Sequence, residues 1–273
     1  MIKLRLLAGV ATVAISAAGV EAAPVTFSAS GANPAAIQAT VDAFRAALGT
    51  LNANVVGSFA SGRREINWDG VPDALSAPNA LPANFFNSNS PRGVVFSSAG
   101  GGFEVSATAA SGTAVRFGNI DASYPNQFQT FSPQRLFTSL GTNVFDVTFF
   151  APGSSAPALT RGFGAVFTDV ELANLTSIAF FDAKNVLLDT IFVPSGANSG
   201  LSFLGADYGA LSISRVRITA GNTALGAPET GGIDLVVADD FIYGEPIPEP
   251  GSLALVTMGV LGLRFVRRRS GRS

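Results

Sequence analysis

Short apolar runs, separated by Gly, Pro, Asn and Asp, follow one another from residue 55 to residue 244. Runs of this length and spacing are typical of antiparallel strands joined by turns. We expect strands at residues 55–59, 64–68, 93–97, 103–108, 143–150, 163–170, 177–181, 186–193, 201–205, 213–219 and 233–244. Eleven strands at this spacing predict two packed antiparallel sheets. The predicted fold class is therefore all-β, a single jelly-roll-like antiparallel β-sandwich.

Local signals add detail to this sandwich. Asn33 and Pro34 are a helix N-cap and a first-turn proline. Apolar residues then recur at helical spacing as far as Gly49: Ile37, Val41, Phe44 and Leu48. We expect one short N-terminal helix at residues 34–48, packed on the domain as a lid. Residues 182–185 read as a hairpin turn between two strong strands.

The first residues have the organisation of a secretory signal. Lys3 and Arg5 precede an apolar run from Leu6 to about Val20, and small residues follow it. This order predicts a signal peptide at residues 1–22, cleaved after Ala22 or Ala23. A membrane helix is the alternative, which the short run and the cleavage-like site disfavour. Export is the expected consequence.

The last residues have an unusual order of features. Pro248, Glu249 and Pro250 precede 13 uncharged residues at 251–263, and a cluster of arginines follows: Arg264, Arg267, Arg268 and Arg269. As a helix, 13 residues span roughly 20 Å, against a hydrocarbon core of about 30 Å. Phe265 and Val266 lengthen the run, so we expect a short transmembrane helix with the arginines on the cytoplasmic side.

This tail closely resembles the PEP-CTERM sorting signal of exported proteins in Gram-negative bacteria. The resemblance implies recognition by an exosortase-type membrane protease and transient residence in the inner membrane. It also implies transfer to the outer surface or extracellular matrix, often alongside exopolysaccharide. A plain C-terminal anchor is the alternative. The expected organisation is a signal peptide at 1–22, a β-sandwich at 23–246 and a sorting signal at 247–273.

Four stretches of the body resemble the globular part of a set of PEP-CTERM proteins. They are GRREINWDGVPD (62–73), SPRGVVFS (90–97), GFGAVFTDVE (162–171) and DLVVADDFIYGEP (234–246). This resemblance implies architecture and location, and no activity.

Composition excludes several classes of function. The chain has no Cys and no His, which excludes thiolate zinc sites and hydrolases with a His base. Residues 23–247 carry ten basic and 17 acidic residues, a net charge near −7, which argues against nucleic-acid binding. No paired catalytic carboxylates are marked by the sequence, so we expect no enzyme.

Two acidic groups are candidate metal ligands. Asp69 and Asp73 lie in a Gly/Pro turn that opens a long loop to about Arg92, and Asp239 and Asp240 lie in the last strand. If the strands before and within these groups are neighbours, Asp69 or Asp73 can approach one of the terminal aspartates, Asp239 or Asp240, around a Ca²⁺ ion, which prefers oxygen ligands. Turn-capping by Asp69 and Asp73 is one alternative.

Alternation along a strand limits the second group. Asp239 and Asp240 are successive residues, so we expect them on opposite faces, with one carboxylate on an apolar face. Such a carboxylate needs a partner. The candidates are Arg63, Arg64, Arg116 or a cation.

We therefore expect an exported cell-surface or matrix protein with a structural or adhesive role linked to exopolysaccharide. A calcium-dependent carbohydrate-binding module is the first alternative, and a polysaccharide-active enzyme the second. Exposed Trp68 or Tyr side chains would favour the carbohydrate-binding module. A cleft with paired carboxylates would favour the enzyme.

Overall fold

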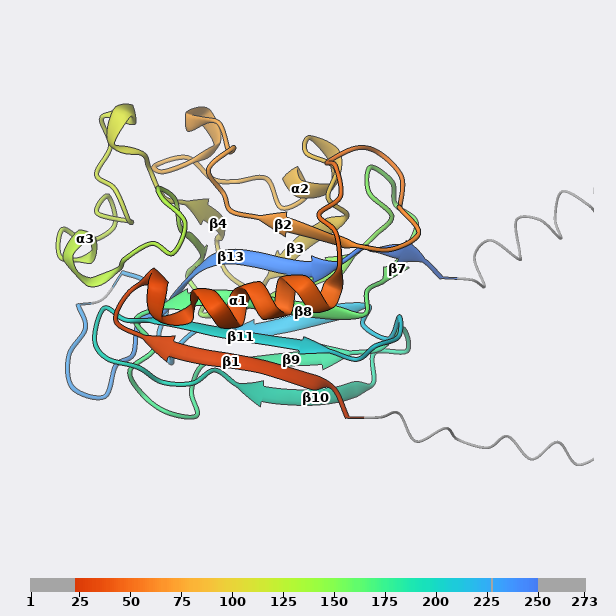
Figure 1. Ribbon diagram of the computed structural model, residues 1–273. Coiled ribbons are helices and arrows are strands. Elements are labelled where there is room, and N and C mark those ends of the chain that lie inside the picture. Colours follow the sequence, from red (N-terminus) through yellow and green to blue (C-terminus); the bar gives the residue numbers. More distant parts are fainter. Residues whose placement is uncertain (1–22, 227, 250–273) are drawn as a thin grey trace, which may run out of the picture.

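The computed structural model describes residues 23–226 and 228–249 as a β-sandwich in which every paired strand is antiparallel (Figure 1). The larger sheet has the order β1 (Val25–Gly31), β11 (Leu201–Asp207), β8 (Gly162–Thr168), β13 (Val237–Gly244), β5 (Phe137–Leu140) and β4 (Gly102–Val105), and β2 (Arg63–Ile66) also pairs with β13. The smaller sheet has the order β10 (Leu187–Phe192), β9 (Ser177–Phe181), β12 (Arg215–Thr219), β6 (Val144–Phe149) and β3 (Val94–Ser98). A two-residue pair joins β7 (Ala158–Leu159) to β14 (Ile247–Pro248).

Aromatic side chains from both sheets fill the space between them. Phe137, Phe163 and Phe241 of the larger sheet share one buried cluster with Phe145 and Phe180 of the smaller sheet. Trp68 stacks on Phe137 with 4.2 Å between ring centroids. Each large aromatic ring buries much apolar area, so this cluster contributes strongly to the hydrophobic stabilisation of the sandwich.

The helix expected at residues 34–48 is present with those bounds as α1 (Pro34–Leu48). The side chain of Asn33 caps its N-terminus, and Gly49 follows its end with φ 96°. The four predicted apolar positions are buried on the outer face of the larger sheet, where Figure 1 shows α1 lying over β8 and β11 and running roughly along them. Shorter helical segments are η1 (Asp73–Leu75), α2 (Phe85–Ser88), η2 (Ala109–Ser111) and α3 (Tyr124–Gln127).

Most of the expected strands are present, although their ends differ by a few residues. The run at 55–59 is not a strand: it belongs to a loop in which Val55 and Val56 are exposed and Ser58 Oγ donates to the Pro246 carbonyl. The expected long loop after Asp69 contains η1 and α2. The strands β1, β5, β7 and β14 were not predicted, and the first of these forms an edge beside β11.

A β-bulge in β13 overturns the prediction that Asp239 and Asp240 face opposite sides. Ala238 pairs with Phe167 and Phe241 pairs with Ala165, so the two aspartates stand opposite the single residue Val166. The extra residue interrupts the alternation of side chains between the two faces of the strand. Both carboxylates consequently reach Ser132, on the side of the sheet that carries α1.

The predicted leader, the apolar run and the arginine cluster lie outside the described residues, as does Pro250. Within residues 23–226 and 228–249, no helix is long and apolar enough to cross a membrane.

Candidate functional site

Asp69 and Asp73 bind groups of the protein itself. Asp69 Oδ1 accepts hydrogen bonds from the backbone N–H groups of Gln134 (2.7 Å) and Arg135 (3.1 Å). Asp73 forms an ion pair with Arg135, whose guanidinium also donates to the Ser106 carbonyl at 2.8 Å. Burial raises the pKa of Asp69, and the two backbone N–H groups oppose this shift. Both carboxylates hold the segment at residues 134–135 against the loop after β2.

Asp239 and Asp240 form a buried pair at the bulge. Asp239 Oδ2 accepts the backbone N–H of Phe131 at 2.6 Å, and Asp240 Oδ1 accepts the hydroxyl of Ser132 at 2.6 Å. Asp240 Oδ2 lies 3.3 Å from Arg45 of α1. Burial, followed by the charge of Asp240, raises the pKa of Asp239 well above its usual range.

The arginine partners expected for this pair are engaged elsewhere. Arg63 binds Glu65, Arg64 binds Glu245, and Arg116 donates to the Phe128 carbonyl. The expectation that the strand at 64–68 lies beside the last long strand is confirmed, because β2 pairs with β13. Among the described residues, however, no three of the four predicted ligands bring carboxylate oxygens within 4.8 Å of one another.

A different acidic group does gather its oxygens. Asp169, Glu171 and Glu229 each place one carboxylate oxygen so that all three lie within 4.8 Å of one another. Asp169 and Glu171 follow the end of β8, whereas Glu229 lies in the loop between β12 and β13. We call these three residues the acidic cluster.

Two neighbours hold the cluster in place. Both carboxylate oxygens of Asp234 accept backbone N–H groups, from Glu171 at 3.1 Å and from Leu172 at 3.3 Å. Gln127 Nε2, at the end of α3, donates to Glu229 Oε2 at 2.6 Å. Four segments distant in sequence therefore meet here, since Ser199 before β11 also donates its N–H to Asp169 Oδ1 at 2.6 Å.

The surroundings of the cluster raise the pKa values of two of its members. Burial is the main cause that raises the pKa of Asp169 to about 6. The hydrogen bond from Ser199 and the nearby side-chain amide of Gln127 oppose this shift, and repulsion from Glu171 and Asp234 adds to it. Burial also raises the pKa of Glu229 to about 7, and the negative charges of Asp169, Glu171 and Asp234 add to the shift. Like charges this close disfavour simultaneous ionisation unless a cation is present.

The sequence contained only half of the signal for this cluster. Asp169 and Glu171 stand two residues apart after a strong strand, and both fall within residues 162–171, a stretch that resembles the globular part of other PEP-CTERM proteins. Nothing in the spacing links them to Glu229, which lies beyond three further strands of the smaller sheet and one of the larger. Only the folded topology brings that loop to the end of β8.

An open hollow of about 350 Å³ adjoins the cluster. It is lined by Ser123, Asn126, Gln127, Asn198, Pro228 and Glu229. Glu229 is the carboxylate of the cluster that lines this hollow, while Asp169 is completely buried. A glycosidase needs two carboxylates on either side of the bond that it cleaves, and this hollow presents one.

A second open surface lies on the smaller sheet, on the face turned away from the core. Paired residues form a row across all five strands: Ser97, Asp146, Arg217, Ala179 and Thr190. Arg217 binds Asp146 through two hydrogen bonds of 2.8 and 3.0 Å. A hollow of about 400 Å³ lies beside this ion pair, with Ser97, Ser98 and Thr142 along it. We call this surface the open face.

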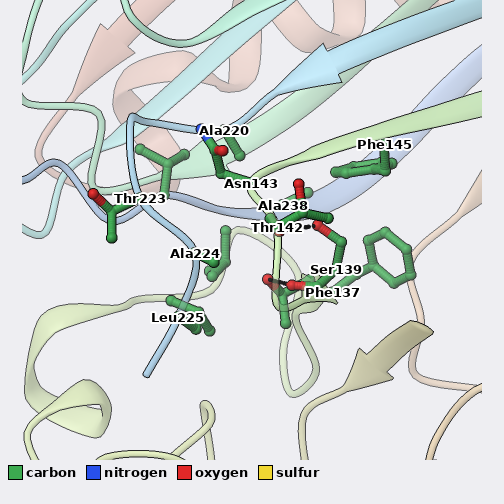
Figure 2. A pocket seen from close by; sticks show the side chains of 13 residues that line it. Phe137, Ser139, Thr142, Asn143, Phe145, Ala220, Thr223, Ala224, Leu225 and Ala238 are labelled. Carbon is green, nitrogen blue, oxygen red and sulfur yellow. Dashed lines mark hydrogen bonds between the residues drawn. The ribbon is translucent and has the colours of Figure 1, made fainter. Parts of the chain in front are cut away.

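An internal cavity at one end of the sandwich is too small for a ligand. Figure 2 shows Ser139 and Thr142 on one side of it, with Thr223, Ala224 and Leu225 on another. Its volume is about 10 Å³, which is about the room that a single water needs.

The aromatic residues expected at a sugar-binding surface are not exposed. Trp68, Tyr124 and Tyr243 are buried, and Tyr208 is half-buried with its hydroxyl donating to Asp189. Trp68 Nε1 donates to the Asp239 carbonyl at 2.6 Å, so its polar edge is satisfied inside the protein.

The chain leaves the described domain through β14. Ile247 and Pro248 pair with β7, and the Glu249 N–H donates to the Pro157 carbonyl at 3.4 Å. Glu249 is thus fixed at the edge of the folded domain, at the end of the sandwich where β13 finishes. Because β8 runs antiparallel to β13, the acidic cluster lies at the opposite end.

Comparison with known proteins identifies the segment that begins here. Residues 246–270 match the family model described as the PEP-CTERM protein-sorting motif. The motif marks the chain as an exported protein of a Gram-negative bacterium that is sorted by an exosortase, a membrane protein. The body is not assigned by this match, because the motif covers only the C-terminal residues.

The other comparisons do not extend the assignment. No curated protein sequence matches the chain. A weak similarity is found to the crystal structure of a glycoside hydrolase family 43 arabinoxylan arabinofuranohydrolase from Bacillus subtilis in complex with cellotetraose. The identity is 20%, the TM-score is 0.24, and the match covers 45% of this chain and 24% of the hydrolase chain.

Proposed function

We propose that this protein is a non-enzymatic component of the outer surface or extracellular matrix, where its β-sandwich has a structural or adhesive role and contacts exopolysaccharide. The observation that carries the proposal is the direct junction between the folded domain and the sorting motif. The motif begins at residue 246, two residues after β13 ends at Gly244. A domain joined so closely to its sorting signal is delivered as a folded unit, with its open surfaces available to polymer.

The open face is the surface that we assign to polysaccharide contact. Arg217 is 49% exposed and Asp146 is 15% exposed, so the pair offers charged donors and acceptors to solvent. The neighbouring Ser97, Ser98 and Thr142 add groups that can exchange hydrogen bonds with sugar hydroxyls. The buried positions of Trp68, Tyr124 and Tyr243 argue against the alternative of a carbohydrate-binding module that stacks sugars on aromatic rings.

Co-sedimentation with exopolysaccharide isolated from the same bacterium tests this assignment. We expect the protein to sediment with the polymer and not with neutral dextran of similar size. Arg217→Ala should reduce the bound fraction several-fold. Arg161→Ala is the matched control, because Arg161 also pairs with an aspartate, Asp207 at the end of β11 in the larger sheet. Equal binding by the two variants would exclude the open face, and no binding by the unmodified protein would exclude the polysaccharide role.

A further inference from the structure

We propose that Asp169, Glu171 and Glu229 bind a calcium ion at the end of the sandwich opposite the sorting motif. This calcium-binding proposal does not depend on the proposed contact between the open face and exopolysaccharide. The site also differs from the metal site that the sequence suggested, which used Asp69, Asp73, Asp239 and Asp240.

The first observation is geometric. The three carboxylate oxygens lie within 4.8 Å of one another. Calcium binds oxygens at about 2.3–2.6 Å, so two ligands on opposite sides of the ion are separated by about 4.6–5.2 Å. Three oxygens at the spacing seen here can therefore bind one calcium ion with little movement.

The second observation is an unsatisfied atom inside the site. Asp169 is completely buried, and its Oδ2 has no hydrogen-bond partner, whereas Oδ1 accepts the Ser199 N–H. Gln127 lies near this carboxylate, but its Nε2 donates to Glu229 at 2.6 Å. A buried carboxylate oxygen without a partner is costly, and a cation would satisfy it.

The third observation is the absence of a basic partner. In the part of the chain that the structure describes, the ion pairs of Arg and Lys side chains all involve other carboxylates. The buried carboxylates of Asp240 and Glu245, by contrast, have Arg45 and Arg64 beside them. The acidic cluster differs from these carboxylates, because a cation from solution would have to balance its negative charge.

The surroundings fit calcium better than magnesium. The cluster joins loops that can adjust to an irregular coordination shell, and its ligands are carboxylates that can bind through one or both oxygens. Glu171 and Glu229 are half-buried, which leaves room for water ligands. Magnesium requires a near-octahedral shell and retains most of its water, so it should bind more weakly here.

Bound calcium would stabilise the contacts among four segments that are distant in sequence. Asp169 and Glu171 extend from β8, Glu229 precedes β13, Gln127 ends α3, and Ser199 precedes β11. The hollow of about 350 Å³ shares Gln127 and Glu229 with the site, so its shape would depend on calcium as well.

Thermal unfolding of the full chain in detergent at pH 7.5, followed by the fluorescence of Trp68, tests the site. After treatment with chelator, CaCl₂ at 100-fold excess over its Kd should raise Tm by about 5–10 °C. MgCl₂ at the same concentration should raise it less. Equilibrium dialysis should give one calcium ion per chain, with a Kd of about 10⁻⁴–10⁻³ M, as in extracellular modules.

Three variants assign the site. Glu229→Gln, which is half-buried and should fold, is expected to weaken calcium binding at least tenfold, and Asp169→Asn should do the same. Asp69→Asn is the matched control, because Asp69 is a half-buried carboxylate of the earlier candidate group, and it should keep the full response. No rise in Tm of the unmodified protein up to 10 mM CaCl₂ would overturn the proposal, as would an unchanged response of Glu229→Gln.

Discussion

Arg64 and Glu245 form a bidentate ion pair that is almost completely hidden from solvent. Arg64 Nε lies 2.7 Å from Glu245 Oε2, and Nη2 lies 2.8 Å from Oε1. Arg64 also donates to the carbonyl groups of Ala53 and Pro91. The pair therefore holds the exposed loop before β2, and it fixes the residue that immediately precedes the sorting motif.

Glu245→Gln should destabilise the fold by about 3–5 kcal/mol, because it leaves the buried Arg64 guanidinium without a counter-charge. Urea unfolding followed by the fluorescence of Trp68, the one tryptophan of the chain, measures the loss. Arg217→Gln is the control: Arg217 is 49% exposed, and Asp146 keeps Arg215, so about 1 kcal/mol or less should be lost. Similar losses in the two variants would show that burial of the Arg64 pair does not matter.

Changing Glu249 to Ala should block sorting and leave full-length protein in the inner membrane. Glu249 lies in the matched motif and at the edge of the folded domain, where an extended segment is accessible to a membrane protease. Membrane fractionation and intact-mass measurement report the outcome. Asp42→Ala, which changes an exposed carboxylate of α1, should be processed normally. Normal processing of the Glu249 variant would mean that the tail serves only as an anchor.

Gly205→Ala should loosen α1 and cost about 1–3 kcal/mol. Gly205 pairs with Gly164 in the larger sheet, and a Cβ at Gly205 would lie 2.9 Å from the Phe44 ring of α1. Urea unfolding should show this loss but almost none for Gly70→Ala, where a Cβ meets nothing within 4 Å. Adding Phe44→Leu should recover part of the loss, whereas strictly additive losses would contradict a clash with Phe44.

Without calcium, the stability of the protein should fall as the pH rises from about 4 to about 7. The folded state holds the protons of Asp169 up to about pH 6 and of Glu229 up to about pH 7, whereas the unfolded chain releases them near pH 4. Over this range the unfolded state therefore binds fewer protons, and the free energy of unfolding decreases. Above pH 7 both groups are ionised and the loss is complete.

Urea unfolding in chelator at several pH values measures this dependence. Burial also raises the pKa values of Asp234, Asp239 and Asp240, which contribute with the same sign. Comparison with Glu229→Gln isolates one group, and the variant should show a flatter profile than the unmodified protein. Superimposable profiles would show that Glu229 titrates normally in the folded state.

Elements defined by neighbouring residues could be predicted from the sequence. The Asn33 cap, Pro34 and the apolar spacing act within one segment, and α1 has the predicted bounds. The turn at residues 182–185 is equally local: Asp182 Oδ1 accepts the N–H groups of Lys184 and Val186, and Asn185 has φ 61°. The buried Val216 and Ile218 between the outward Arg215 and Arg217 likewise follow from strand alternation.

The tertiary structure decided which charged side chains meet. The bulge at Asp239 and Asp240 shifts the register between β13 and β8, and it changes the faces that simple alternation predicts for the two carboxylates. Arg64 pairs with Glu245, and Asp169 lies beside Glu229, although several strands separate the two members of each pair in the sequence. A side chain's partner is fixed by sheet order and loop packing, which are properties of the whole chain, whereas helices and turns are stabilised by hydrogen bonds between neighbours. The sorting motif could be recognised in the sequence because an enzyme recognises it as a linear segment, and the acidic cluster could not because only the folded sandwich assembles it.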